Sequence, residues 1–159
     1  GFRTSLRPPR SHLLTMSDDT VTTGQCYCGA VKLECKGEPM NVVCHCLDCA
    51  RWTGSVNLAS LYPCDAVTVT GELKEFSKQL PDGKENPSKR RCCAKCNGAV
   101  LNDHPSMNLT DVVSGVLSRE FKPLFHIFYE KKIWGVKDGL PKFKDMPADM
   151  GGSGDTMDE

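Results

Sequence analysis

Three short cysteine motifs constrain this chain more than any other feature of its sequence. Cys26 and Cys28 lie two positions apart, Cys93 and Cys96 form a Cys-X-X-Cys pair, and the stretch CHCLDC at 44–49 adds three more thiols. Cysteines this close in sequence bridge each other only with strain, whereas they can readily share one metal ion. The spacing therefore favours metal binding over disulfides, and we expect a reducing compartment, the cytosol or the nucleus.

The number of thiols in each group predicts two kinds of site. A structural zinc normally takes four protein ligands, whereas a catalytic zinc keeps three and leaves one position open. The sequence therefore predicts two Zn²⁺ sites: a structural one held by Cys26, Cys28, Cys93 and Cys96, and an open, catalytic one held by Cys44, Cys46 and Cys49.

Length and charge exclude several classes of protein. A chain of 159 residues, 39% of them hydrophobic, is long enough for one domain with a core. Lys plus Arg equals Asp plus Glu at 20 each, which argues against a dedicated nucleic-acid binder. No apolar run approaches the roughly 20 residues that cross a bilayer, so we expect no membrane association.

Composition divides the chain into three parts. We expect a disordered extension at 1–22, a zinc-binding domain at 23–147 and a disordered acidic tail at 148–159. The last fifteen residues, 145–159, contain five acidic residues and no basic one. Residues 1–15 carry three arginines and no acid, as organelle transit peptides do, although a vector remnant or translated leader is the preferred interpretation.

Alternating apolar and polar residues predict a β-rich domain. The clearest case is 31–36, and further strands are expected at 42–43, 56–61, 67–70, 73–76, 112–117 and 124–129, with one helical turn at 50–52. Residues 77–90 form a polar, locally basic loop around Pro81-Asp82-Gly83. This loop is either a solvated connection, which we prefer, or a docking edge for an anionic ligand.

Together, these motifs resemble the glutathione-dependent formaldehyde-activating enzyme family. The similarity rests on GQCYCGAV at 24–31, CHCLDC at 44–49, CAKC at 93–96, and a late stretch with His126-Ile127, Trp134 and DGLP at 138–141. It spans about 24–147 in the right order. Two departures are visible near the last knuckle, where Cys92 replaces a usual aromatic and Asn97 precedes the usual Gly.

The resemblance implies a mainly β fold, a β-tent of small coiled antiparallel sheets built around zinc knuckles. By position, the four-cysteine group matches the family's structural site and the three-cysteine group its catalytic site. The implied reaction joins glutathione to formaldehyde or a related small aldehyde, giving S-(hydroxymethyl)glutathione, and is classed with carbon–sulfur lyases. The implied partners are therefore glutathione and a small aldehyde.

Two other functions remain open at this point. One is a non-catalytic, zinc-stabilised module that binds a thiol or a protein. The other is a chromatin or cytoskeleton adaptor like the family member centromere protein V, which the charge balance disfavours because the chain has no extended basic tract.

Several further side chains are candidates for supporting roles. His45 is expected to point away from the flanking ligands and to pack or support them, and Asp48 to cap a turn. Three residues are interpreted as packing groups: Cys35, Cys64 and Cys92. Four others are expected in the core or along a cleft wall: Trp52, Trp134, His104 and His126.

Overall fold

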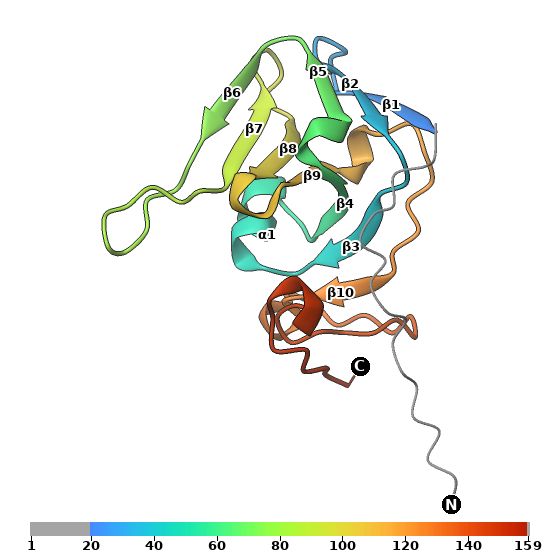
Figure 1. Cartoon of the computed structure of the whole chain (residues 1–159), viewed down its shortest axis with the longest axis vertical. Coiled ribbons are helices and arrows are strands. Elements are labelled where there is room, and N and C mark those ends of the chain that lie inside the picture. The colour runs from blue at the N-terminus through green and yellow to red at the C-terminus, as the bar shows by residue number, and fades with distance from the viewer. Residues whose placement is uncertain (1–19, 159) are drawn as a thin grey trace, which may run out of the picture.

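The computed structural model describes residues 20–158 and, within them, shows a mainly β protein with a single α-helix (Figure 1). The predicted extension up to residue 19 lies outside the described residues. A three-stranded antiparallel sheet has the order β1-β2-β5, with β1 at Val21–Gln25, β2 at Lys32–Lys36 and β5 at Val67–Thr70.

The larger sheet has seven strands. It is antiparallel except where β10 pairs with β3 in parallel. In sheet order, its strands are β10 (Phe125–Ile127), β3 (Met40–Cys44), β4 (Asn57–Pro63), β9 (Leu109–Val113), β8 (Ala99–His104), β7 (Lys89–Cys93) and β6 (Leu73–Phe76). Five short 3₁₀ helices join the elements: Cys64–Ala66, Pro105–Met107, Ser114–Val116, Tyr129–Lys131 and Ala148–Met150.

The clearest predicted strand is confirmed. In β2, Leu33 and Cys35 are buried while Lys32 and Glu34 are exposed. β1 differs from the prediction, because it begins at Val21, inside the segment expected to be disordered. Its order comes from pairing with β2 along its whole length, a long-range contact that five residues of sequence do not reveal.

The seven-stranded sheet separates two cores. One lies between the sheets and includes Tyr62 of β4; the other lies on the opposite face and includes Leu61 of the same strand. Because neighbouring residues of a strand point to opposite faces, β4 serves both cores. The second core contains Cys44 and Cys49, so the three-cysteine motif is built into the packing of the domain.

The predicted helical turn is the middle of α1 (Leu47–Thr53). Cys46 caps the N-terminus of α1, where its sulfur accepts a hydrogen bond from Cys49 N at 3.2 Å. Gly54 ends the helix with a positive φ of 80°, a conformation that glycine adopts without strain. No helix among residues 20–158 is long and apolar enough to span a membrane.

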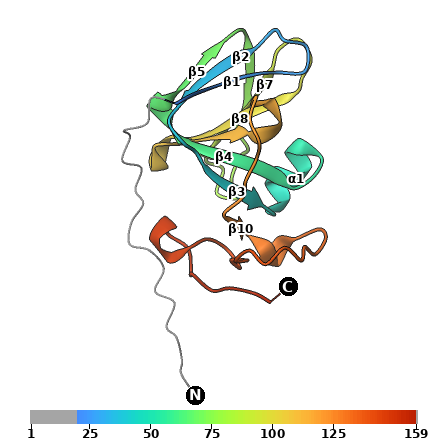
Figure 2. The ribbon, with the colours of Figure 1, turned by 90° about the vertical axis from the view of Figure 1, so that its right-hand side faces the viewer.

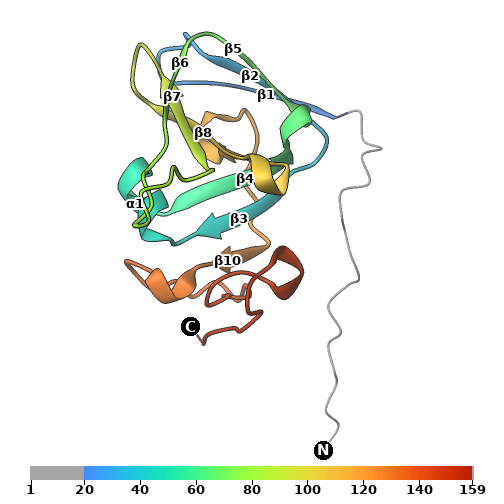
Figure 3. The ribbon, with the colours of Figure 1, turned by 60° about the vertical axis from the view of Figure 1, so that its left-hand side comes forward.

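The C-terminal segment, residues 132–158, packs along β10 and forms a layer beyond the edge of the sheet (Figures 2 and 3). His126 N donates to the Pro141 carbonyl oxygen, and Phe143 N donates back to the His126 carbonyl oxygen, each at 2.9 Å. This ladder covers the free edge of β10, which would otherwise present unpaired backbone groups.

The expectation of a disordered acidic tail from 148 onward is wrong for residues 148–158. Met157 N donates to the Lys142 carbonyl oxygen and Lys144 N donates to the Asp155 carbonyl oxygen, each at 2.8 Å, so this stretch is tied to residues 142 and 144. Asp145 Oδ1 accepts hydrogen bonds from the backbone N and the hydroxyl of Ser153. The acidic composition suggested a solvated tail. In the structure, however, the Asp145 carboxylate accepts hydrogen bonds that hold a local turn, and composition alone does not distinguish these two roles of an acid.

Candidate functional site

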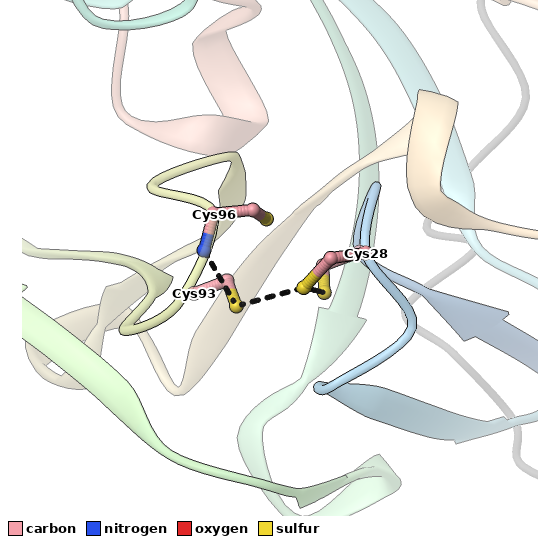
Figure 4. A group of neighbouring side chains, drawn as sticks. Cys28, Cys93 and Cys96 are labelled. Atoms are coloured by element: carbon pink, nitrogen blue, oxygen red, sulfur yellow. Dashed lines mark hydrogen bonds between the residues drawn. The ribbon is translucent and has the colours of Figure 1, made fainter.

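Two loops that are far apart in sequence bring four of the predicted ligands together. Cys26 and Cys28 follow β1, and Cys93 and Cys96 frame the turn between β7 and β8; their four sulfurs lie within 4.8 Å of one another. Figure 4 shows Cys28 facing Cys93 and Cys96 across this gap. The sequence therefore identified a real cluster of thiols.

The sulfur spacing in this cluster fits a metal better than a disulfide. Cys28 Sγ lies 3.6 Å from Cys26 Sγ and 3.8 Å from Cys93 Sγ, far beyond the roughly 2.05 Å of a disulfide. Four sulfurs placed tetrahedrally at about 2.3 Å from a zinc ion are separated by about 3.8 Å. The spacing is that of the edges of such a tetrahedron.

Backbone amides point at these sulfurs. Val31 N donates to Cys26 Sγ at 3.3 Å, and Cys96 N donates to Cys93 Sγ at 3.5 Å (Figure 4). Such bonds favour a charged thiolate over a thiol. Asn97, one of the departures from the family pattern, has a φ of 57°, a left-handed conformation that asparagine tolerates. The departure thus leaves the turn geometry intact.

The three remaining predicted ligands come from one continuous stretch at the edge of the second core. Cys44 ends β3, Cys46 caps α1 and Cys49 lies in its first turns, and their sulfurs also lie within 4.8 Å of one another. Cys44 and Cys49 are buried, while Cys46 is partly exposed. Among residues 20–158, no fourth histidine, cysteine or carboxylate completes this group.

The three thiols oppose one another's ionisation. Hydrogen bonds from Cys44 and Cys49 lower the pKa of Cys46, and the same bond with Cys46 raises the pKa of Cys44. Like charges held this close oppose one another, whereas a bound divalent cation removes that opposition. An all-sulfur donor set that resists full ionisation on its own fits a soft metal ion such as zinc.

A cavity of about 390 Å³ opens at the three-cysteine cluster. Its volume lies within the usual range for small-molecule sites. It lies over the face of the seven-stranded sheet that carries the second core, with α1 contributing Cys46 and Cys49 to its wall. The loop at 77–90 lines its mouth through Lys78, Asn86 and Ser88. The loop is therefore part of the cavity wall, where a ligand could contact it, and is not only a solvated connection between strands.

Arg90 of β7 is far from the three-cysteine motif in sequence but places its positive charge beside that cluster. Both terminal nitrogens of its guanidinium lie 3.8 Å from Cys49 Sγ, and the group stacks over the Trp52 ring at 4.9 Å. After the hydrogen bonds from Cys44 and Cys49, the charge of Arg90 also lowers the pKa of Cys46, and stacking on an aromatic ring fixes the guanidinium plane. Neither Trp52 nor the half-exposed Trp134 lines the cavity, but Trp52 holds Arg90, which does.

Polar side chains of β8 and β9 form a further wall of the cavity, and among them only His104 was expected along a cleft. Asp111 of β9 is buried and accepts a hydrogen bond from Asn57 Nδ2 at 2.8 Å on Oδ2, while Oδ1 has no hydrogen-bond partner. Burial raises the pKa of Asp111 to about 7, although Arg90 opposes the shift. On the same wall, His104 hydrogen-bonds Ser88 and Asn102. The only signal in the sequence was polar residues within strands.

His45 points away from the cavity, as expected for a residue between two ligands. Its Nε2 lies 2.8 Å from His126 Nδ1, and His126 Nε2 lies 2.8 Å from Asp138 Oδ2. The carboxylate accepts from His126, so a neutral His126 accepts in turn from His45. Burial lowers the pKa of His45 to about 4, so His45 is neutral at physiological pH.

The other singled-out residues have structural roles. Cys35 is fully buried, and Cys64 and Cys92 are partly buried outside both clusters. Asp48 does not cap the turn, a role that Cys46 takes; it lies in the first turn of α1, lines the cavity and pairs with Lys78 at 2.9 Å. An exposed pair of this kind contributes little to stability.

Comparison with known proteins decides the family. The sequence model of the glutathione-dependent formaldehyde-activating enzyme family matches residues 21–131, more than half of the chain. The chain belongs to this family. The match includes all seven clustered cysteines and ends before the C-terminal segment. The description of the family is that of an enzyme, which supports a catalytic role for the cavity.

Searches of other proteins add little to this assignment. A crystal structure of a Rhodobacter sphaeroides protein is similar, with 22% identity over 62% of this chain and 89% of that one and a TM-score of 0.48. No curated protein matches the chain.

Proposed function

We propose that this protein is a zinc-dependent enzyme of the carbon–sulfur lyase type that joins the thiol of glutathione to formaldehyde or a related small aldehyde. One observation carries the proposal: Cys44, Cys46 and Cys49 form a three-sulfur group, one ligand short of a closed site, at a cavity of about 390 Å³. Family membership supports glutathione and formaldehyde as the substrates.

The two clusters would divide the work between them. Cys26, Cys28, Cys93 and Cys96 would hold a structural zinc, and Cys44, Cys46 and Cys49 would hold the catalytic one. Zinc bound to three thiolates would keep an incoming thiol deprotonated at neutral pH, where a free thiol is only a few per cent ionised.

In the addition, a sulfur–carbon bond forms while the carbonyl π pair moves onto oxygen, which then takes a proton. Asp111 is the chain's own candidate donor, since its buried carboxyl has a pKa raised to about 7 and its Oδ1 has no partner. A general acid works best when its pKa lies near the working pH. Arg90 holds positive charge beside Cys49 and balances the negative charge of the sulfur group.

Glutathione would enter at the polar mouth of the cavity. Lys78, Asn86 and Ser88 from the loop at 77–90 line this mouth beside Arg90, offering donors for a peptide carboxylate. The close spacing of the cysteines favours shared metal ions over disulfides, so we propose a reducing compartment, the cytosol or the nucleus.

The test compares rates of adduct formation. Glutathione and formaldehyde are mixed with zinc-loaded protein, and S-(hydroxymethyl)glutathione is followed by NMR exchange spectroscopy against a protein-free control. The proposal expects acceleration by the wild type and none by Cys46→Ser. Equal acceleration by both proteins would remove the catalytic claim. Glutathione binding without acceleration would indicate a non-catalytic thiol-binding module.

A further inference from the structure

The cavity beyond the cysteines has two kinds of lining residue. The polar ones are described above. The apolar lining, here called the methionine chamber, is formed by side chains from β3, β4, β9, β10 and the segments beside them. They are Val42, Ala59, Leu61, Met107, Leu109, Ile127, Phe128, Met146 and Met150.

The cavity as a whole is larger than formaldehyde requires. Formaldehyde has two heavy atoms, one more than water, whose share of liquid volume is about 30 Å³. The whole cavity measures about 390 Å³. Apolar walls give water no hydrogen-bond partners, so a chamber of this lining favours an apolar occupant over solvent.

The walls come partly from a region outside the family match. Met146 and Met150 belong to the C-terminal segment, whereas the match ends at residue 131. The ladder between β10 and residues 141–145 holds this segment in place. Methionine is flexible and polarisable, and it is used where a surface must fit ligands of varied shape. The chamber is therefore an ordered feature of this chain with an adaptable lining.

We propose that the aldehyde partner carries an apolar chain of several carbons, which occupies the methionine chamber while its carbonyl carbon lies at the three-cysteine cluster. This inference rests on the proposed function and names its substrate class. The chemistry is unchanged: one sulfur–carbon bond forms, the carbonyl π pair becomes an O–H bond, and no oxidant or reductant is needed. The polar mouth stays available for glutathione.

The inference predicts a dependence on chain length. Each methylene moved from water into an apolar environment tightens binding about threefold to fourfold. Apparent affinity should therefore rise stepwise from butanal to octanal and level off once the chamber is full. Formaldehyde, which has no alkyl chain to bury, should bind most weakly of the series.

The first test needs neither a thiol nor a carbonyl. Straight-chain alkanols from butanol to octanol are titrated into the full chain labelled with ¹³C in its methionine methyl groups. We expect the methyl signals of Met107, Met146 and Met150 to shift, with affinity rising threefold to fourfold per methylene. The signal of Met157, which does not line the cavity, should stay unchanged. No chain-length gain, or shifts confined to Met157, would overturn the inference.

The second test uses a matched pair of variants. Met150→Trp narrows the chamber and should abolish the gain from butanol to octanol, whereas Met157→Trp on the same segment should retain it. The aldehyde series then separates this inference from the proposed function. Reaction with formaldehyde but no preference for octanal contradicts the substrate class alone. Alkanol binding without reaction of any aldehyde contradicts the proposed function and leaves an apolar binding site.

Discussion

His45 Nε2 lies 2.8 Å from His126 Nδ1 and so joins the three-cysteine motif to the C-terminal half of the chain. The link continues through His126 Nε2 to Asp138 Oδ2, and the buried Lys142 Nζ contacts Asp138 Oδ1 at 2.8 Å. Burial opposes ionisation of Asp138, but hydrogen bonds from Lys142 and His126 keep its pKa below the ordinary value. This series of hydrogen-bonded and charged side chains therefore supports the three-cysteine motif on the side away from the cavity.

Removing that carboxylate should destabilise the domain. Asp138→Asn removes the carboxylate that pairs with the ammonium of Lys142, a residue that is 2% exposed. Breaking a buried ion pair by removing one partner costs about 3–5 kcal/mol, and the partial exposure of Asp138 reduces this to about 2 kcal/mol in urea unfolding. The control is Asp149→Asn, an exposed acid on the same segment, with an expected change within about 0.5 kcal/mol. Equal unfolding free energies for the two variants would show that the series of contacts from His45 through His126 to Asp138 does not stabilise the domain.

The knuckles were predictable from sequence because their information is local. Two thiols one to three residues apart share an ion whatever the rest of the chain does, so Cys44, Cys46 and Cys49 could be grouped before any fold was known. Pairing Cys26 and Cys28 with Cys93 and Cys96 needed only the count of four. The alternation in β2 was equally local.

The remainder of the site depends on register between distant strands. Arg90 lies on β7, three strands from β4 in the sheet, and this strand order brings it within reach of Cys49. Asp111 faces the cavity because β9 pairs with β4 in the register that places Asp111 opposite Leu61. The C-terminal segment was misjudged because its acids suggested solvation, whereas the backbone ladder that orders it depends on β10. No periodicity in the sequence encodes these contacts.

The two cysteine clusters should respond differently to substitution. Cys93→Ser removes a ligand that joins two distant loops, so it should release one zinc and lower the unfolding free energy by several kcal/mol. Cys46→Ser lies in one continuous stretch and should release one zinc while the rest of the fold persists. Zinc content by mass spectrometry and thermal unfolding measure both effects. The reverse ranking of stabilities would contradict the division into structural and open sites.

Asp111 should make stability depend on pH. Burial raises its folded-state pKa from 3.8 to about 7, so the folded protein binds more protons than the unfolded chain between these values. Stability from this group is present below about pH 4 and is lost as pH rises through about 7. The loss should be on the order of 1–4 kcal/mol in wild type relative to Asp111→Asn, measured by urea unfolding at pH 4, 6 and 8. Parallel pH profiles for the two proteins would exclude a buried, titrating carboxyl.

Arg90 should control how the site receives an anionic thiol. Arg90→Ala removes the charge beside Cys49 and the stacking on Trp52, so glutathione affinity should fall about tenfold, the effect of roughly 1.4 kcal/mol. Isothermal titration of zinc-loaded protein measures this change. Arg51→Ala, an exposed arginine in α1, serves as the control and should bind as wild type does. A similar loss of glutathione affinity in both variants would show that Arg90 acts only through the net charge of the protein.

X-ray absorption at the zinc edge tests the central claim most directly. Seven sulfurs shared between two ions give an average of three and a half per zinc, with one lighter donor at the open site. Saturating glutathione should raise the average to four sulfurs and remove the lighter donor. A single zinc per chain, or a coordination shell that glutathione leaves unchanged, would contradict an open thiol-binding metal at Cys44, Cys46 and Cys49.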